Sequence, residues 1–431
     1  MSFQRKLLVI ALAGVMPMAS VYAQSAADLQ KDIAALKAQL QALQQKVDAL
    51  TSQPVPPALT QQITRMEQKQ ELAEDVVEKS GLKGMKFKGA IEAAYTYDTA
   101  SGAHTMAARD GVGAGSTAML ELTKETEEND GVNWTLRLTP GGPSLVHEAT
   151  VSVGVAPGMR VFGGLMPDFQ GYEAYFAHQN LFVSHHALYD FAGPTSYSGL
   201  GMMQQLNKEL ALKWIVGNID GGTDTGTAAG GALKPSVGLA YRFDWTLSEY
   251  ATLGFSGAHA ASTRFFDVVA VDGGFIRGDW QFNGQVTLGQ LKGGAYAGGD
   301  ANWSGLSGLV GYKLTPRLQL LGRADYLENR KNGGGTYVYN YLNNPLDVLG
   351  TGATAGTGLG PELDSTGTVV DPTVGANLTR LSLGTNYLLN ATTQWKTEVR
   401  LDQSSGYNFK DEGGAPKRDK TSIGTSLVVS F

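Results

Sequence analysis

The chain has 431 residues, and no interior stretch has the composition of a linker, so one large body is expected rather than several small domains. Charged residues make up only 17% of the sequence, whereas an average soluble protein has roughly 25%. The net charge of -6 argues against a nucleic-acid partner, because phosphate binding needs a basic surface. The sequence contains no cysteine, which excludes disulfides, thiol nucleophiles and thiolate metal sites.

Residues 1–23 have the pattern of a signal peptide. Arg5 and Lys6 precede an apolar run from Leu7 to Val15, and cleavage is expected after Ala23. The apolar run is too short to span a bilayer as a helix, and no later stretch reaches about 18 apolar residues. An exported membrane protein of this kind must therefore span with strands, because only helices and closed barrels satisfy their backbone groups in lipid.

A heptad pattern occupies much of residues 24–80. Its apolar positions alternate at spacings of four and three, at Leu29, Ile33, Leu36, Leu40, Leu43, Val47 and Leu50. A proline-rich break at residues 54–57 separates this seam from a weaker one that ends at Ser80. The pattern predicts a periplasmic coiled-coil segment that associates copies of the chain. A single amphipathic helix packed on a globular core is the alternative, although it would usually show a wider apolar stripe.

Beyond Gly84 the hydrophobic period changes to two. In residues 85–98 the apolar side chains of Phe87 and Ile91 share one face, while Lys88 and Glu92 share the other. The same alternation recurs in 132–139, 209–217 and 236–245. A soluble antiparallel sheet alternates too, but repeated charged faces opposite aromatic-rich faces favour a strand with lipid on one side and water on the other. Residues 81–431 are therefore predicted to form an all-β transmembrane antiparallel β-barrel.

About sixteen strands are expected, with 14 and 18 left open. Their ranges are 85–98, 116–126, 131–139, 145–155, 159–166, 196–204, 208–217, 235–245, 250–260, 266–281, 285–291, 302–314, 317–330, 378–390, 393–403 and 421–431. A hairpin turn is assigned to Asn283-Gly284, because such a pair is a strong turn signal. An even strand number places both ends of the barrel in the periplasm. Short connections then alternate with long ones, as in a porin-like barrel.

Charged residues of both signs fall on the predicted lumen face. The candidate pore-lining residues are Arg137, Lys213, Arg242, Arg277, Arg323, Asp325, Arg380, Lys396, Glu398, Arg400 and Asp402. Rows of such charges set the ion preference of a pore. They can equally pair across strands and solvate the wall, and the two roles are compatible. A slight excess of basic groups around Arg380 and Arg400 predicts a modest preference for anions.

The connection 167–195 is rich in aromatic residues and contains three of the six histidines. A loop this apolar is expected to fold into the barrel and narrow it, with Asp168, Glu173, His178, His185 and His186 as its candidate constriction residues. No metal site is expected, since adjacent histidines point apart on a helix and no carboxylate or cysteine spacing completes a ligand set. Packing or hydrogen bonding is the expected role of these histidines. No nucleophile elbow or acid pair is recognisable, so neither an enzyme nor a cofactor is expected.

The last residues alternate up to the final aromatic, with Ile423, Leu427, Val429 and Phe431 on one face. The edge strand of a soluble sandwich is the alternative interpretation. With the signal peptide, the heptad segment and the long loop after the fifth strand, this ending resembles trimeric Gram-negative outer-membrane porins, above all the DcaP-like and OmpL-like porins with an N-terminal coiled coil.

The resemblance implies a homotrimeric channel in outer-membrane lipid for small hydrophilic solutes, with Phe431 as a signal for the barrel assembly machinery and the N-terminal segment in the periplasm. It carries no motif that identifies the solute. Two other functions remain open on the sequence. One is a structural outer-membrane barrel whose coiled coil contacts the periplasm or cell wall, and the other is a surface adhesion or ligand-binding barrel.

Overall fold

The computed structural model describes residues 65, 69, 84–99, 102–105, 118–126, 131–140, 145–219, 236–261, 265–336 and 357–431. The chain divides into two units, Met1–Lys83 and Gly84–Phe431. The predicted signal peptide, and the predicted coiled-coil segment apart from residues 65 and 69, lie outside the described residues. The fold below is that of the second unit.

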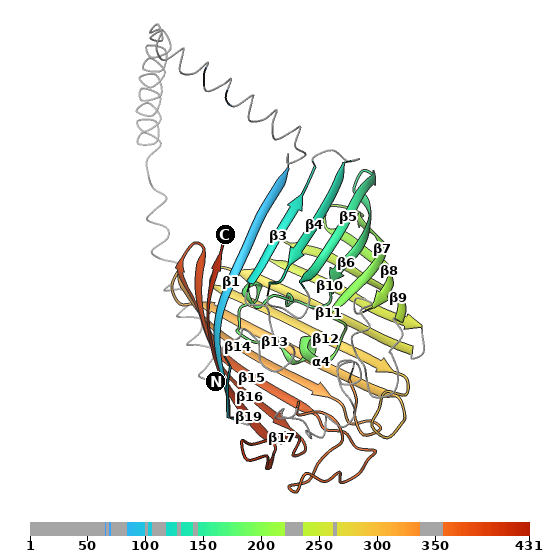
Figure 1. Cartoon of the computed structure of the whole chain (residues 1–431), viewed down its shortest axis with the longest axis vertical. Coiled ribbons are helices and arrows are strands. Elements are labelled where there is room, and N and C mark those ends of the chain that lie inside the picture. Colours follow the sequence, from blue (N-terminus) through green and yellow to red (C-terminus); the bar gives the residue numbers. More distant parts are fainter. Residues whose placement is uncertain are drawn as a thin grey trace, which may run out of the picture. The chain divides into compact units, whose positions relative to one another are not determined.

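In the described part of the chain, sixteen antiparallel strands form the wall of a closed barrel (Figure 1). They are β1 (Met85–Asp98), β3 (Ala118–Lys124), β4 (Val132–Leu138), β5 (Val146–Ala156), β6 (Met159–Pro167), β7 (Ser196–Gln205), β8 (Leu210–Ile219), β9 (Ser236–Ser248), β10 (Ala251–Ala261), β11 (Phe265–Arg277), β12 (Trp280–Leu291), β13 (Ala301–Lys313), β14 (Leu318–Glu328), β15 (Leu378–Asn390), β16 (Thr393–Ser404) and β19 (Asp419–Ser430). Each pairs with the next in sequence, and β1 pairs with β19 from Ala90 opposite Ser430 to Asp98 opposite Ser422. Closure leaves no free sheet edge, which a lipid environment requires.

Three short strands, one 3-10 turn and one short helix lie outside this wall. The strand β2 (Ala103–Thr105) pairs with the end of β1, and β17 (Phe409–Lys410) pairs with β18 (Pro416–Lys417). A 3-10 turn, η1 (Ala177–Gln179), and a short helix, α4 (Ala187–Phe191), belong to the connection between β6 and β7. No helix among the described residues is long and apolar enough to cross a membrane.

The predicted alternation of faces is confirmed along β1 and recurs in later strands. In β1, Ile91 is 54% exposed on the outer face, whereas its neighbour Glu92 is 5% exposed on the inner face. The outer face of the later strands is equally apolar, for example at Leu306 and Leu383. Because successive side chains of a strand point to opposite faces, a period-two sequence gives an apolar outside and a polar inside.

The predicted turn at Asn283-Gly284 is wrong. The turn consists of Gly278 and Asp279, and it places Arg277 directly opposite Trp280. Gly278 has a φ of +60°, a left-handed conformation that glycine adopts at little cost. Asn283 and Gly284 lie within β12 and pair with strands on both sides, so their backbone groups are already satisfied.

This two-residue turn also corrects the position of Arg277. Directly opposite residues share a face, and Trp280 lies on the outer face with Phe282 and Val286. Arg277 therefore lies on the outer face, over the ring of Tyr250 at 5.2 Å, and does not line the lumen. With a three-residue turn, even-numbered residues would lie on the same face in both strands, as the sequence suggested. With the two-residue turn, even-numbered residues lie on opposite faces in the two strands.

The barrel closes at the last residue of the chain. The Gly89 amide donates to the Phe431 carbonyl at 2.8 Å, and the Phe431 amide donates to the Gly89 carbonyl at 3.0 Å. The Phe431 ring lies 5.9 Å from the Phe87 ring, directly over Gly89, where a Cβ would overlap it. The terminal residue thus completes the seam between the first and last strands.

If Phe431 is also an assembly signal, Phe431→Ala should lower the amount of folded barrel in cells several-fold. Phe282→Ala, which removes a similarly exposed outer aromatic ring, is the matched control and should have little effect. Both variants should refold equally well in detergent, because each loses one ring and keeps its backbone bonds. Equal barrel levels in cells for the two variants would show that Phe431 is an ordinary wall residue.

Candidate functional site

Residues 168–195, which join β6 to β7, contact the inner face of the wall, and α4 is seen within the ring of strands (Figure 1). The Tyr172 hydroxyl lies 2.6 Å from the Ser307 hydroxyl of β13. The Ala187 amide donates to Asp325 of β14 at 3.0 Å. The Ser184 amide donates to Glu398 of β16 at 2.7 Å. We call this segment the inner loop.

Apolar contacts explain why the inner loop packs inside. The ring of Phe182 is fully buried against Leu309 and Leu321 on the inner wall. In α4, Leu188 and Phe191 are buried in a second apolar cluster that includes inner residues of β6 to β15. Burying a side chain of this size contributes about 1.5–3 kcal/mol, so these contacts offset part of the entropy lost on ordering the loop.

A buried ion cluster centred on Arg323 of β14 joins the inner loop to the wall. Its guanidinium lies 2.8 Å from Glu173 of the loop, 3.4 Å from Glu398 and 3.6 Å from Asp325. It also donates to the Ser184 and His185 carbonyls of the loop, at 3.0 and 2.9 Å. The five-donor fork of arginine suits such a site, since one side chain satisfies several acceptors at once.

A second cluster lies next to the first, on β15 and β16. Arg380 contacts Asp402 at 2.7 Å, Asp190 of α4 at 2.6 Å and the His185 carbonyl at 2.9 Å. Asp402 also contacts Arg400 at 2.9 Å. Nearby, the Lys396 amine donates to the Asn180 carbonyl of the inner loop at 2.5 Å. Loop and wall are thus held by charge-assisted hydrogen bonds as well as by apolar packing.

Seven charges expected to line the pore face inward but are buried, and all of them except Arg400 and Asp402 contact the inner loop directly. Each is at most 3% exposed, and they are Arg323, Asp325, Arg380, Lys396, Glu398, Arg400 and Asp402. The expectation that they face open water is therefore wrong. Alternation along a strand specifies the face of a side chain, but it does not specify what packs over that face.

Three predicted residues lie on the inner face of the other part of the wall. Arg137 of β4 contacts Glu121 and Glu148, and Arg242 of β9 contacts Asp272 at 2.8 Å. Arg137, Lys213 and Arg242 each keep part of their surface exposed. Among the described residues, Lys213 makes no ion pair within 4.0 Å, and its amine lies 5.2 Å over the Phe169 ring of the inner loop.

Arg160 of β6 is a further inner residue that the sequence reasoning missed. Arg160, Met203, Lys213 and Arg242 lie directly opposite one another across β6, β7, β8 and β9. They form a row with three basic members, which we call the basic row. A cavity of about 350 Å³ is lined by Arg160, Lys213 and Asp244. The alternation of faces within the predicted strand 159–166 places Arg160 on the inner face, and this pattern could have identified it.

The candidate constriction residues serve mainly as contacts within the inner loop. Asp168 accepts from the Gln170 amide at 3.3 Å, and the Asp168 amide donates to the Thr195 carbonyl at 2.9 Å. Burial raises the pKa of Glu173 to about 7, although the nearby Arg323 guanidinium opposes this shift.

The three histidines pack or hydrogen-bond. His185 stacks on Tyr189 with ring centroids 4.0 Å apart, and His186 caps α4 by accepting from the Tyr189 amide at 3.1 Å. The His178 ring lies 5.5 Å from the Phe176 ring, and burial lowers the pKa of His178 to about 4. Within the described ranges, no group of three His, Cys, Asp or Glu side chains is placed to hold a metal ion.

Comparison with known proteins places this geometry in a family. Residues 84–431 match the family model "Putative beta-barrel porin-2, OmpL-like". A search of curated proteins finds no match.

Solved structures share the fold at low sequence identity. OmpT, an outer membrane protein of Vibrio cholerae, aligns with a TM-score of 0.53 and 10% identity, covering 80% of this chain and 97% of that chain. The anion-selective porin from Comamonas acidovorans gives 0.52 and 10%, with 80% and 99% covered. The outer membrane channel DcaP of Acinetobacter baumannii gives 0.51 and 12%, with 80% and 97% covered.

The family match extends over the whole barrel, from the first described residue of β1 to the terminal Phe431. The barrel has an apolar outer face and an inner face that carries charged side chains and a cavity. The chain belongs to the OmpL-like β-barrel porins and is an outer-membrane channel for small solutes.

Proposed function

We propose that the protein is a water-filled diffusion channel for small hydrophilic solutes and performs no catalysis. Its passage runs along the inner face of β4 to β9. The inner loop narrows it, since the loop packs on β13 to β16 and also contacts Arg137 and Arg242. This proposal rests on the difference in exposure between the charged side chains on the two sides of the lumen. The charges of β14 to β16 are covered, while the basic row stays partly exposed beside a cavity.

A modest preference for anions follows from the same contrast. Lys213 and Arg160 are basic groups of the open side that no described acid neutralises within ion-pair distance, whereas Arg137 and Arg242 each contact two acids. Charges in a wide aqueous pore are screened over about 8 Å at physiological salt, so the bias is small. The porin of Comamonas acidovorans, which has the same fold, is described as anion-selective.

Single-channel recording of the purified protein in planar bilayers tests the channel proposal. We expect stepwise current that grows with salt concentration, as in a water-filled pore. A protein that serves only as a cell-wall anchor or an adhesion barrel would insert without steps of current, and that result would overturn the proposal.

We further propose that the protein is a homotrimer with its N-terminal segment in the periplasm. The heptad positions from Leu29 to Leu50 support association, although they lie outside the described residues. The pairing of Gly89 with Phe431 puts both ends of the barrel at one rim, which supports a periplasmic position for both.

Changing Leu36 and Leu43 to Lys should reduce the heat-resistant oligomer on gels while the barrel still folds, because charged residues at seam positions disrupt a coiled coil. Changing Gln41 and Gln45 to Lys, at outward-facing heptad positions, is the control and should leave the oligomer intact. If the seam variant keeps its oligomer, the coiled coil has no part in association.

A further inference from the structure

Uncharged polar side chains gather on the inner face of β10 to β16, near the rim that holds both ends of the barrel. At this rim, Thr393 at the start of β16 pairs with Val429 near the end of the chain. Alternation places the group inside, since chain neighbours such as Leu320 and Trp395 are exposed on the outer face. We call this group the polar track, and its members are Thr252, Gln281, Asn283, Gln319, Asn386 and Gln394.

Hydrogen bonds join members of the polar track across neighbouring strands. The Gln319 side-chain amide donates to Gln281 at 3.3 Å, and the Gln281 amide donates to Asn283 at 3.1 Å. Gln319 also lies directly opposite Asn386 of β15. The Asn386 amide donates to Gln394 of β16 at 3.1 Å. Amide groups thus follow one another along the inner wall from β12 to β16.

Two inner glycines give these amides room to lie along the wall. A Cβ at Gly311 of β13 would lie 2.5 Å from the Gln319 amide nitrogen, which extends across β13. A Cβ at Gly274 of β11 would lie 3.1 Å from the Asn283 amide nitrogen and 3.3 Å from the Thr252 hydroxyl. Because a side chain at either position would crowd the amides, the two glycines keep the polar track open to the lumen.

The polar track has hydrogen-bonding capacity that the wall does not use. Among the described residues, no partner is found for the Asn283 side-chain nitrogen or for the Gln319 side-chain oxygen. Gln281, Asn283 and Gln319 each keep part of their surface exposed. The Asn386 side-chain oxygen is also without a partner in this part of the chain, although Asn386 is only 8% exposed. The track can therefore both donate to and accept from a solute.

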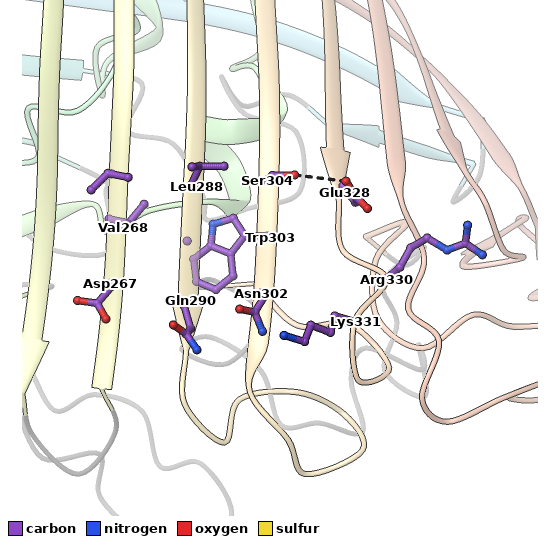
Figure 2. Close-up of a pocket in the computed structure, with 12 residues that line it drawn as sticks. Asp267, Val268, Leu288, Gln290, Asn302, Trp303, Ser304, Glu328, Arg330 and Lys331 are labelled. Carbon is purple, nitrogen blue, oxygen red and sulfur yellow. Dashed lines mark hydrogen bonds between the residues drawn. The ribbon is translucent and has the colours of Figure 1, made fainter.

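Amides on the outer face of the same strands are already engaged. Gln290 and Asn302 lie in a groove of about 480 Å³ over β11 to β14 (Figure 2). Gln290 donates to the Asp300 carboxylate at 3.2 Å, and Asn302 donates to the Asp300 carbonyl at 3.0 Å. These two amides thus stabilise the connection between β12 and β13, and they provide matched controls for the inner amides.

We propose that the polar track binds the hydroxyl groups of carbohydrate solutes in the lumen. The assignment rests on the proposed channel and names the class of solute that the channel favours. Asn283 offers a donor and Gln319 an acceptor, and Gln281 holds both side chains by hydrogen bonds. A sugar hydroxyl both donates and accepts, and a sugar ring carries several, so one ring can bond to adjacent amides at once.

Block of single-channel current by maltose tests the assignment on the full-length protein in planar bilayers. The exposed Lys313 lies directly opposite Gln319, so an uncharged sugar is needed to separate hydroxyl binding from attraction between charges. A short poly(ethylene glycol) of similar mass measures how far any bulky solute excludes ions. It is a suitable reference because it presents ether oxygens and few hydroxyls.

Three variants are compared with the wild type. The first carries Gln281→Leu and Gln319→Leu, which remove two inner amides. The second, Gly311→Ala, keeps every amide and displaces the Gln319 amide from its place across β13. The control carries Gln290→Leu and Asn302→Leu, the same kind of change on the outer face. Heat-modified migration on gels establishes that each variant is folded, and Gly311→Ala decides the question if the first variant is not.

We expect maltose to lower the wild-type current to a plateau, as a site that fills, whereas the polymer lowers it in proportion to its concentration. The maltose concentration that gives half of the block should rise about tenfold in the double Leu variant, because two hydrogen-bonding side chains are lost. Gly311→Ala should shift it in the same direction by a smaller factor. The outer-face control should match the wild type.

Two results would overturn the assignment while leaving the channel in place. Maltose that blocks in proportion to its concentration, like the polymer, would show that no site fills. An equal shift in the outer-face control would show that the block responds to a general change in the barrel and not to the polar track. Absence of current in all four proteins would overturn the proposed channel, and this assignment with it.

Discussion

Replacing Arg323 with Met is expected to free the inner loop from the wall and to raise single-channel conductance by about twofold or more. The change leaves Glu173, Glu398 and Asp325 without the guanidinium that they surround. Removing one partner of a buried ion pair costs about 3–5 kcal/mol, because the remaining charges stay buried without compensation. Released loop segments would also make the open-channel current noisier.

The barrel itself should survive this change. The ladder between β14 and β15 uses backbone groups, and Met preserves most of the buried volume of the Arg stem. Arg323→Lys should give an intermediate conductance, since it keeps the charge and loses the fork. Arg317→Met, at an exposed turn position, should behave as the wild type. Wild-type conductance in Arg323→Met would show that Phe182 and α4 hold the loop without the ion cluster.

Changing Lys213 and Arg160 together to Glu should shift the channel from a weak anion preference to a cation preference. Both residues belong to the basic row, and the double change moves the local charge by four units beside the cavity that they line. The reversal potential in a salt gradient measures this shift. The shift should be large at low salt and small near 1 M, where the Debye length falls to about 3 Å.

Arg277→Glu is the matched control for this experiment. Arg277 lies on the outer face opposite Trp280, so its charge should not influence ions in the lumen. A reversal potential that moves as far in Arg277→Glu as in the double variant would contradict the assigned passage. So would an unchanged reversal potential in the double variant at low salt.

The sequence predicts the barrel wall well because a lipid-exposed strand records its two faces at every second residue. The sixteen strands and the faces of β1 follow from that alternation alone. The one hairpin that was misplaced depended on a local turn signal, Asn283-Gly284, and pairing with strands on both sides outweighed it. The error reversed the predicted face of Arg277 because strand parity depends on the length of the turn.

The cover over the inner charges could not be predicted in the same way. Glu173 and Arg323 are 150 positions apart, and nothing in the spacing of either residue indicates the other. The aromatic content of residues 167–195 was the basis for expecting an inward loop, since Phe182 and Phe191 require an apolar environment.

The passage along β4 to β9 can be tested directly, because the chain has no cysteine of its own. Single cysteines replace Lys213 on the basic row, Ser382 under the inner loop and Leu383 on the lipid-facing surface. Ser382 is 2% exposed, whereas Leu383 is 72% exposed on the lipid-facing surface. The two controls should therefore exclude the reagent for different reasons. Each variant is recorded in a planar bilayer while a negatively charged, water-soluble thiol reagent is added.

We expect the reagent to reduce the current through Lys213→Cys in discrete steps, as each lumen is partly blocked. The current through Ser382→Cys and Leu383→Cys should stay constant, because the inner loop covers the first position and lipid covers the second. A rapid block of Ser382→Cys together with an unaffected Lys213→Cys would place the passage on the opposite side of the barrel and contradict the proposed channel.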